Sequence, residues 1–105
     1  MSTVFAQKVL NLKSSIEYQE NSIVSKTITE NKDSSLTLFA LDNGQSIAAH
    51  SAPVDAVIQV LEGILEVMID EKYYTLNEGE IILMPKNLPH ALNTKSKVKM
   101  ALFKV

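Results

Sequence analysis

The regular spacing of turn-forming residues is the feature that most constrains the fold of this chain. Residues 31–34, 42–44, 62–63 and 77–79 carry the Asn, Asp, Ser and Gly residues that favour turns. Turns recur roughly every 8–12 residues, which leaves room for short strands but not for a long helix. All three glycines fall at the ends of such segments. The pattern therefore predicts an all-β barrel or sandwich.

The segments between the turns are rich in β-branched and apolar residues and predict short strands. In the clearest case, Leu65, Val67 and Ile69 alternate with Glu66 and Met68, which gives one buried and one wetter face. Residues 9–12 could begin a further strand near the N-terminus. The predicted strands are 23–28, 36–41, 47–50, 57–61, 65–69, 73–76, 81–84, 90–93 and 98–105.

Composition indicates one folded domain, residues 1–105, with 46% hydrophobic residues and no low-complexity tract. The absence of cysteine excludes disulfides, thiolate metal ligands and cysteine nucleophiles. The N-terminus lacks the pattern of a signal peptide, and no apolar run approaches the roughly 20 residues of a membrane span. We therefore expect a soluble, cytoplasmic protein with no membrane partner.

The charge pattern argues against nucleic acid as a partner. The net charge is −2, and the lysines are spread along a chain that has no arginine. Bidentate recognition of phosphate depends on the guanidinium group, and no basic stripe replaces it. The densest basic group, Lys95, Lys97 and Lys99, alternates along the chain and is interpreted as a solvent-exposed face.

Two stretches that are far apart in sequence each carry one of the two histidines. The first contains Gly44, His50 and Gly63, and the second contains Gly79, Pro85, His90 and Asn93. The spacing of these residues resembles the two motifs of the cupin superfamily. The flanking segment 59–70, QVLEGILEVMID, also resembles a strand pair that is usual in this family. Asn87 stands where the second motif has a glycine, and asparagine tolerates a left-handed backbone better than most residues.

The resemblance implies a single double-stranded β-helix, or jelly-roll, barrel in which His50 and His90 point into one cavity. Residues 34–105 would form the conserved barrel, and residues 1–33 would supply N-terminal strands and a dimerisation region. Small single-barrel cupins resemble proteins that dimerise, and the early part of this chain is unusually apolar. We therefore expect a homodimer. The apolar residues concerned are Val4, Phe5, Val9, Leu10, Ile23 and Val24.

Metal-binding cupins usually supply three histidines and a glutamate, and this chain departs from that set. Ala52 stands in the place of the second histidine and Ala56 in the place of the glutamate, which leaves His50 and His90. A catalytic metal normally needs three protein ligands. Asp55 is the candidate third ligand, although strand alternation would turn it to the opposite face. No cofactor is expected, and a weakly bound Zn, Mn, Fe or Ni ion is left open.

The same positions predict a ligand pocket in which His50 and His90 are the polar groups. Neutral imidazoles offer one donor and one acceptor each, and burial would favour that neutral form. A histidine considered alone in a strand is more often a surface or hydrogen-bonded core residue, and the methionines are more often plain core residues. The predicted pocket consists of His50, Ala52, Ala56, Ile58, Met84, His90 and Met100.

Three functions remain open after this reading, because the cupin fold hosts many unrelated activities. The preferred function is a non-catalytic protein that binds a small, mainly apolar molecule in the barrel. The first alternative is a metal-dependent enzyme of the dioxygenase or isomerase type with an incomplete ligand set. The second alternative is a structural or regulatory dimeric module. The loss of two ligands favours the binding protein and the module over the enzyme. The sequence itself identifies no substrate.

Overall fold

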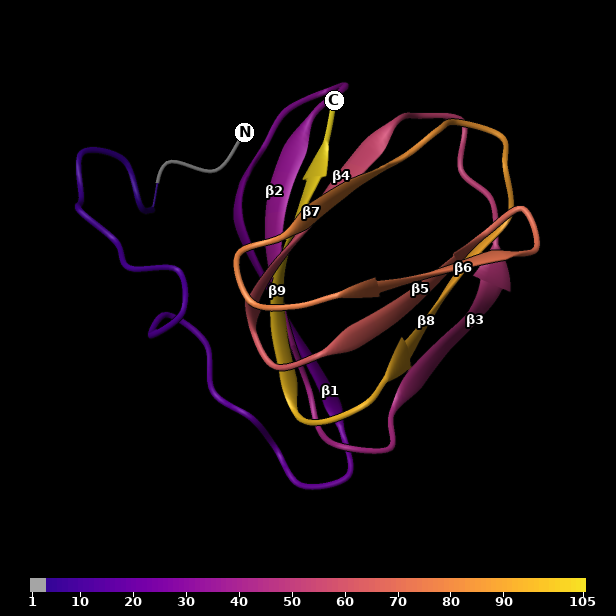
Figure 1. Cartoon of the computed structure of the whole chain (residues 1–105). Helices are drawn as coiled ribbons and strands as arrows, with labels where there is room; N and C mark the ends of the chain where they lie inside the picture. Colours follow the sequence, from indigo (N-terminus) through magenta and orange to yellow (C-terminus); the bar gives the residue numbers. More distant parts are fainter. Residues whose placement is uncertain (1–3) are drawn as a thin grey trace.

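The computed structural model describes residues 4–105, and all of its regular structure in that range is β-strand. The strands form a five-stranded sheet in the order β1-β2-β9-β4-β7 and a four-stranded sheet in the order β3-β8-β5-β6. The sheets face each other in a jelly roll (Figure 1), so the all-β prediction is confirmed. The strands are β1 (Ile23–Glu30), β2 (Ser35–Leu41), β3 (Ser46–His50), β4 (Ala56–Glu62), β5 (Leu65–Ile69), β6 (Lys72–Leu76), β7 (Ile81–Met84), β8 (His90–Thr94) and β9 (Val98–Lys104).

The turns lie where the glycines predict them, and Gly63 shows why the residue is needed there. Gly63 has a φ of +91°, in the left-handed region that side chains disfavour. A Cβ atom at this position would lie 2.0 Å from the Lys97 carbonyl oxygen. The β4–β5 turn therefore packs directly against the loop that leads into β9, and only glycine allows that approach.

The main core lies between the two sheets and is built by strand alternation. Residues of β4 and β9 that point inward, such as Ile58, Val60 and Met100, meet Leu65 and Val67 of β5 from the opposite sheet. All of these side chains are essentially inaccessible to solvent. The side chains of the two inner faces interdigitate and form the core between the sheets.

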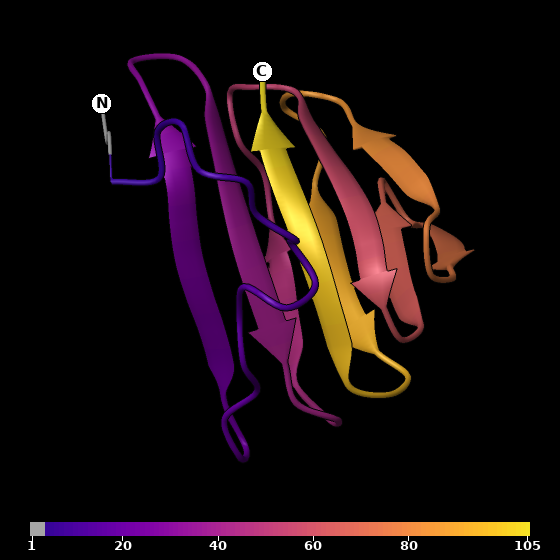
Figure 2. The same ribbon diagram turned by 90° about the vertical axis from the view of Figure 1, so that its left-hand side faces the viewer.

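A second apolar cluster covers the outer face of the five-stranded sheet. There the chain before β1 crosses β1, β2 and β9 as irregular coil (Figure 2), and Ile16 is its most buried residue. Ile16 packs with Leu38, Ala40 and Ala101 of the sheet. The prediction of a strand at residues 9–12 is therefore wrong. These residues form coil and turn, and the side chains of Leu10 and Leu12 pack on the sheet.

No helix within the described residues 4–105 is long and apolar enough to cross a membrane.

We predict a homodimer, but the structure reduces the apolar surface that motivated it. Phe5, Leu10 and Val24 pack against the chain's own sheet, while Val4 and Val9 remain 67% and 103% exposed. A partner that covers the remaining exposed residues would bury apolar surface, and each Å² buried would stabilise the dimer by about 25 cal/mol. Light scattering at tens of micromolar protein should therefore give the mass of two chains, and a stable mass of one chain would contradict the prediction.

Candidate functional site

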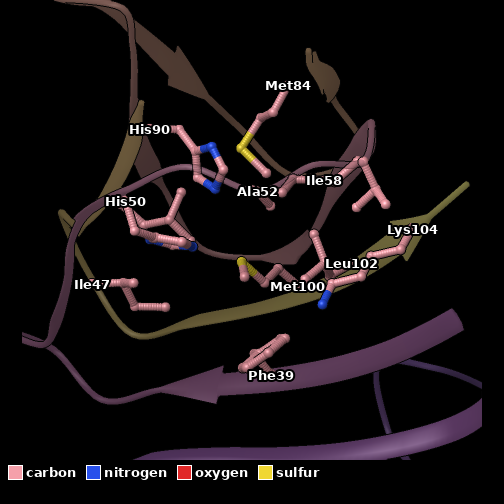
Figure 3. Close-up of a pocket in the computed structure, with 13 residues that line it drawn as sticks. Phe39, Ile47, His50, Ala52, Ile58, Met84, His90, Met100, Leu102 and Lys104 are labelled. Atoms are coloured by element: carbon pink, nitrogen blue, oxygen red, sulfur yellow. The ribbon is translucent and has the colours of Figure 1, made fainter. Parts of the chain in front are cut away.

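A cavity of about 360 Å³ opens between the two sheets, with walls from both (Figure 3). Every residue that the sequence predicted for the pocket lies in its lining. Sequence reasoning missed the remaining lining residues, most of which continue the same strand alternation. The lining consists of Phe39, Ile47, His50, Ala52, Val54, Ala56, Ile58, Met84, His90, Leu92, Met100, Leu102 and Lys104.

The five-stranded sheet forms the apolar wall of the cavity. Met100, Leu102 and Lys104 occupy alternate positions of β9 and share its inward face. Lys104 lies directly opposite Ala56 in the β9–β4 ladder, and Ala56 lies opposite Met84 of β7. Ala56, which stands where the motif has a glutamate, is therefore flanked in its own sheet by Lys104 and Met84.

The four-stranded sheet supplies the histidines, and a β-bulge brings the first of them inward. In the β3–β8 ladder Ile47 pairs with Leu92 and His50 with His90, so two residues of β3 stand opposite one residue of β8. Strict alternation from Ile47 would turn His50 to the outer face. The extra residue reverses that parity, as bulges do, and places His50 in the lining.

The two imidazoles meet edge to face. Their ring centroids are 4.4 Å apart and the rings are inclined by 66°. His90 is almost completely buried, whereas His50 remains exposed to solvent. The structure thus confirms that residues from two distant stretches face each other, and Figure 3 shows both rings beside the apolar wall.

Backbone contacts fix the tautomer of each neutral ring. The Nδ1 atom of His50 lies 3.1 Å from the Ala48 carbonyl oxygen, and that of His90 lies 3.3 Å from the Leu88 carbonyl oxygen. A carbonyl oxygen can only accept a hydrogen bond, so each Nδ1 must carry the hydrogen. Each Nε2 atom then has a free lone pair, and a neutral pair offers two acceptors to a bound molecule.

Burial keeps His90 neutral near pH 7. Removal from solvent is the main cause that lowers the pKa of His90, and the neighbouring His50 lowers the pKa further. The hydrogen bond to the Leu88 carbonyl favours the charged form and opposes this shift only in part. A deprotonated His90 is therefore the resting form of the site.

The donor set does not fit a resident catalytic metal. His50 and His90 are brought together, but Asp55 is not in the cavity lining: its Oδ1 atom accepts a hydrogen bond of 2.8 Å from the Lys86 backbone N–H. Residues 4–105 contain no group of three or more His, Cys, Asp or Glu side chains that could hold a metal ion. The cavity supplies two imidazoles, one fewer than the usual protein ligands of a catalytic metal.

Among the lining residues that the sequence did not predict, Lys104 matters most for the chemistry of the cavity, because its side chain carries a charge. The alternation of Val98, Met100 and Leu102 already points to position 104 as the next inward residue. A lysine at the end of a strand is usually solvent-exposed, which hides this signal in the sequence. Its side chain is indeed exposed, yet it borders the cavity.

The lowered pKa of His90 predicts that acid destabilises the fold. Between the unfolded pKa of about 6.5 and the lower folded pKa, the unfolded chain binds more protons, so stability falls as the pH is lowered through this window. The free energy of unfolding, measured with denaturant from pH 8 to pH 5, should show this slope. His90→Asn should remove part of it. An unchanged slope in that variant would assign the acid sensitivity to other groups.

Comparison with known proteins identifies the family of the chain. Residues 37–105 match the cupin domain family. No curated protein matches the chain in sequence. A conserved protein of unknown function from Streptococcus pyogenes is 36% identical, with a TM-score of 0.91, and the similarity covers 99% of this chain and 91% of that one.

Two further solved structures share the fold. A cupin 2 conserved barrel domain protein from Leptotrichia buccalis is 35% identical with a TM-score of 0.88, over 91% of this chain but 47% of that one. Salicylate 1,2-dioxygenase from Pseudaminobacter salicylatoxidans is 17% identical with a TM-score of 0.73, over 78% of this chain and 26% of the enzyme. At that identity the likeness shows the fold alone. With its two histidines at the matching motif positions, the chain belongs to the cupin family.

Proposed function

We propose that the protein binds a small, mainly apolar molecule in the cavity, with His50 and His90 as its hydrogen-bonding partners. The observation that carries this proposal is the lining itself: two imidazoles and one lysine stand in an otherwise apolar wall. A volume of about 360 Å³ falls within the range of small-molecule sites, which are mostly apolar with a few polar groups that fix orientation.

The chemistry of the histidines narrows the kind of polar group that the molecule would carry. Because each Nδ1–H is directed to a backbone carbonyl, the neutral rings present acceptors at Nε2. A hydroxyl or amide N–H of the ligand would donate to one of them, and such a bond contributes about 0.5–1.5 kcal/mol. Burial of the ligand's carbon atoms against residues such as Ile58 and Met100 would add about 0.8 kcal/mol per methylene group.

A metal-dependent enzyme is the second candidate, and one observation favours it. Nδ1 hydrogen bonds to backbone carbonyls are also the arrangement that orients metal-binding histidines. Against it stand the missing third ligand and the lysine opposite Ala56, since a nearby ammonium group disfavours a divalent cation. We therefore prefer the binding function without a tightly held metal.

Filling the cavity should abolish binding. Ala52 lines the cavity, and Ala52→Phe would place a ring within it. The matched control is Ala49→Phe, since Ala49 is exposed and outside the lining. Phenol, benzyl alcohol and 1-hexanol at millimolar concentration should raise the melting temperature of wild type and of the control, but not of Ala52→Phe. The proposal fails if the Ala52→Phe variant responds as wild type does.

Restoring the family's ligand set should create a metal site that the wild-type protein lacks. Ala52→His with Ala56→Glu would complete four donors, but the new glutamate would lie opposite Lys104 and could pair with it. Adding Lys104→Met should therefore strengthen the site. In thermal unfolding, Zn, Mn, Fe or Ni should raise the melting temperature of the triple variant most and that of wild type least. At a free metal concentration of 100 times Kd, the free energy of unfolding increases by about 2.7 kcal/mol.

Wild-type protein that purifies with one metal ion per chain would contradict this order. So would a gain in stability from metal as large as that of the triple variant. Either result would favour the enzyme alternative, with His50 and His90 as metal ligands.

A further inference from the structure

We infer that the natural ligand of the cavity is an anion, a small carboxylate whose apolar body carries a hydroxyl or N–H donor for the histidines, and that the Lys104 ammonium group binds its carboxylate. The inference rests on the proposed function and extends it by naming the chemical class of the ligand. It also assigns the recognition of charge to a residue outside both cupin motifs. The evidence is the position of Lys104, the charges around it and the residue opposite it.

The position of Lys104 is fixed by the regular pairing of β9 with β2. β9 pairs residue by residue with β2 from Ser35↔Lys104 to Leu41↔Val98, without a bulge. The inward side of β9 is therefore the same at both ends, and Lys104 follows Met100 and Leu102 on it. Figure 3 shows the Lys104 side chain running from the end of β9 back toward Leu102, beside the cavity.

The charges of the lining favour an anion. Among residues 4–105, no Asp or Glu lines the cavity, and Lys104 is the lining residue with a full charge when the histidines are neutral. The salt bridges found in the described part of the chain involve Lys13 and Lys95, not Lys104. An ammonium group beside an apolar wall gains most from a counter-charge that reaches it there.

The residue opposite Lys104 explains why this cavity would prefer an anion where the cavity of a metal-binding cupin holds a cation. In the motif that the sequence resembles, the position of Ala56 holds a glutamate that helps to bind a cation. Here Ala56 supplies no carboxylate, and the residue directly opposite it in the β4–β9 ladder is the cationic Lys104. The alanine also leaves space beside the ammonium group, since Ala56 and Lys104 both line the cavity. A ligand carboxylate could occupy the space that a glutamate side chain would fill.

A competing interpretation comes from the other side of Lys104. The lysine also borders a shallow hollow lined by Glu30 and Asp33, between β1 and β2. Its ammonium group could turn toward these carboxylates instead of the cavity. Neither of them lies within salt-bridge distance of Lys104 in the structure, whose ion pairs lie elsewhere. The experiment must therefore separate a cavity role of Lys104 from a surface role.

Matched acids and amides test the inference by calorimetry. 4-Hydroxybenzoate and 4-hydroxybenzamide have nearly the same shape, as do 6-hydroxyhexanoate and 6-hydroxyhexanamide, so each pair differs mainly in charge. All four carry a hydroxyl group that can donate to an Nε2 atom of the histidines. Wild type should bind at least one acid about tenfold more tightly than its amide, the size expected for a hydrogen bond to a charged group. Lys104→Met should remove this preference without weakening the amide. Lys104→Arg should retain most of it.

Lys32→Met is the matched control, because it removes the same charge from the hollow beside Glu30 and Asp33 but not from the cavity. It should leave the acid preference unchanged. If the amides bind as tightly as the acids, or if Lys104→Met and Lys32→Met act alike, the inference is overturned while the proposed binding function stands. If neither acids nor amides bind at millimolar concentration, the inference and the proposed function both fail.

Discussion

The central position of β9 in the five-stranded sheet is the constraint on which the rest of the structure depends. β9 pairs along its length with β2 on one side and with β4 on the other. Its inward residues line the cavity, and its outward residues Lys99, Ala101 and Phe103 face the N-terminal segment. One strand therefore supports both the candidate site and the covering of the opposite face. A change in the register of β9 would displace both at once.

The outward side of β9 holds the N-terminal segment through polar contacts as well as apolar packing. The Lys99 ammonium group is buried and donates a hydrogen bond of 2.7 Å to the Lys13 carbonyl oxygen. Tyr18 donates to Glu62, and that bond is the main cause that lowers the pKa of the Glu62 carboxyl. The Lys99 Nζ atom also lies 5.3 Å from the centre of the Tyr18 ring. The N-terminal segment is therefore fixed at several points along its path.

The sequence predicted the strands because they depend on local signals, and it predicted the meeting of the histidines through the resemblance to the two cupin motifs. Turn residues and glycines mark the strand ends, and the spacing from Gly44 to His50 and from Gly79 to His90 places each imidazole in its strand. Coil that packs through Ile16 and Tyr18 was not predictable in the same way, because apolar residues in coil and in strand look alike over a few positions. The irregular path of residues 4–22 is decided by the sheet beneath it.

The site shows the same division between local and non-local information. Ala52, Ala56 and Met84 could be placed in the cavity from their motif positions, whereas the role of Lys104 depends on its neighbour across the sheet. The inward turn of His50 depends on a mismatch between two strands, which no pattern in one strand reveals. Pairing partners therefore carried the information that the sequence alone did not.

The bulge in β3 has a consequence for how this protein can change over evolution. Ala48 and Ala49 are exposed, so exchange of their side chains should be well tolerated. Deletion of either residue would remove the bulge and leave one residue of β3 opposite one residue of β8, so simple alternation from Ile47 would still turn His50 inward. Loss of the bulge without a deletion would instead turn the imidazole to the outer surface, although no residue of the cavity would have been substituted. The chemistry of the cavity therefore depends on the match between the length of β3 and its pairing, and a relative one residue shorter could retain it.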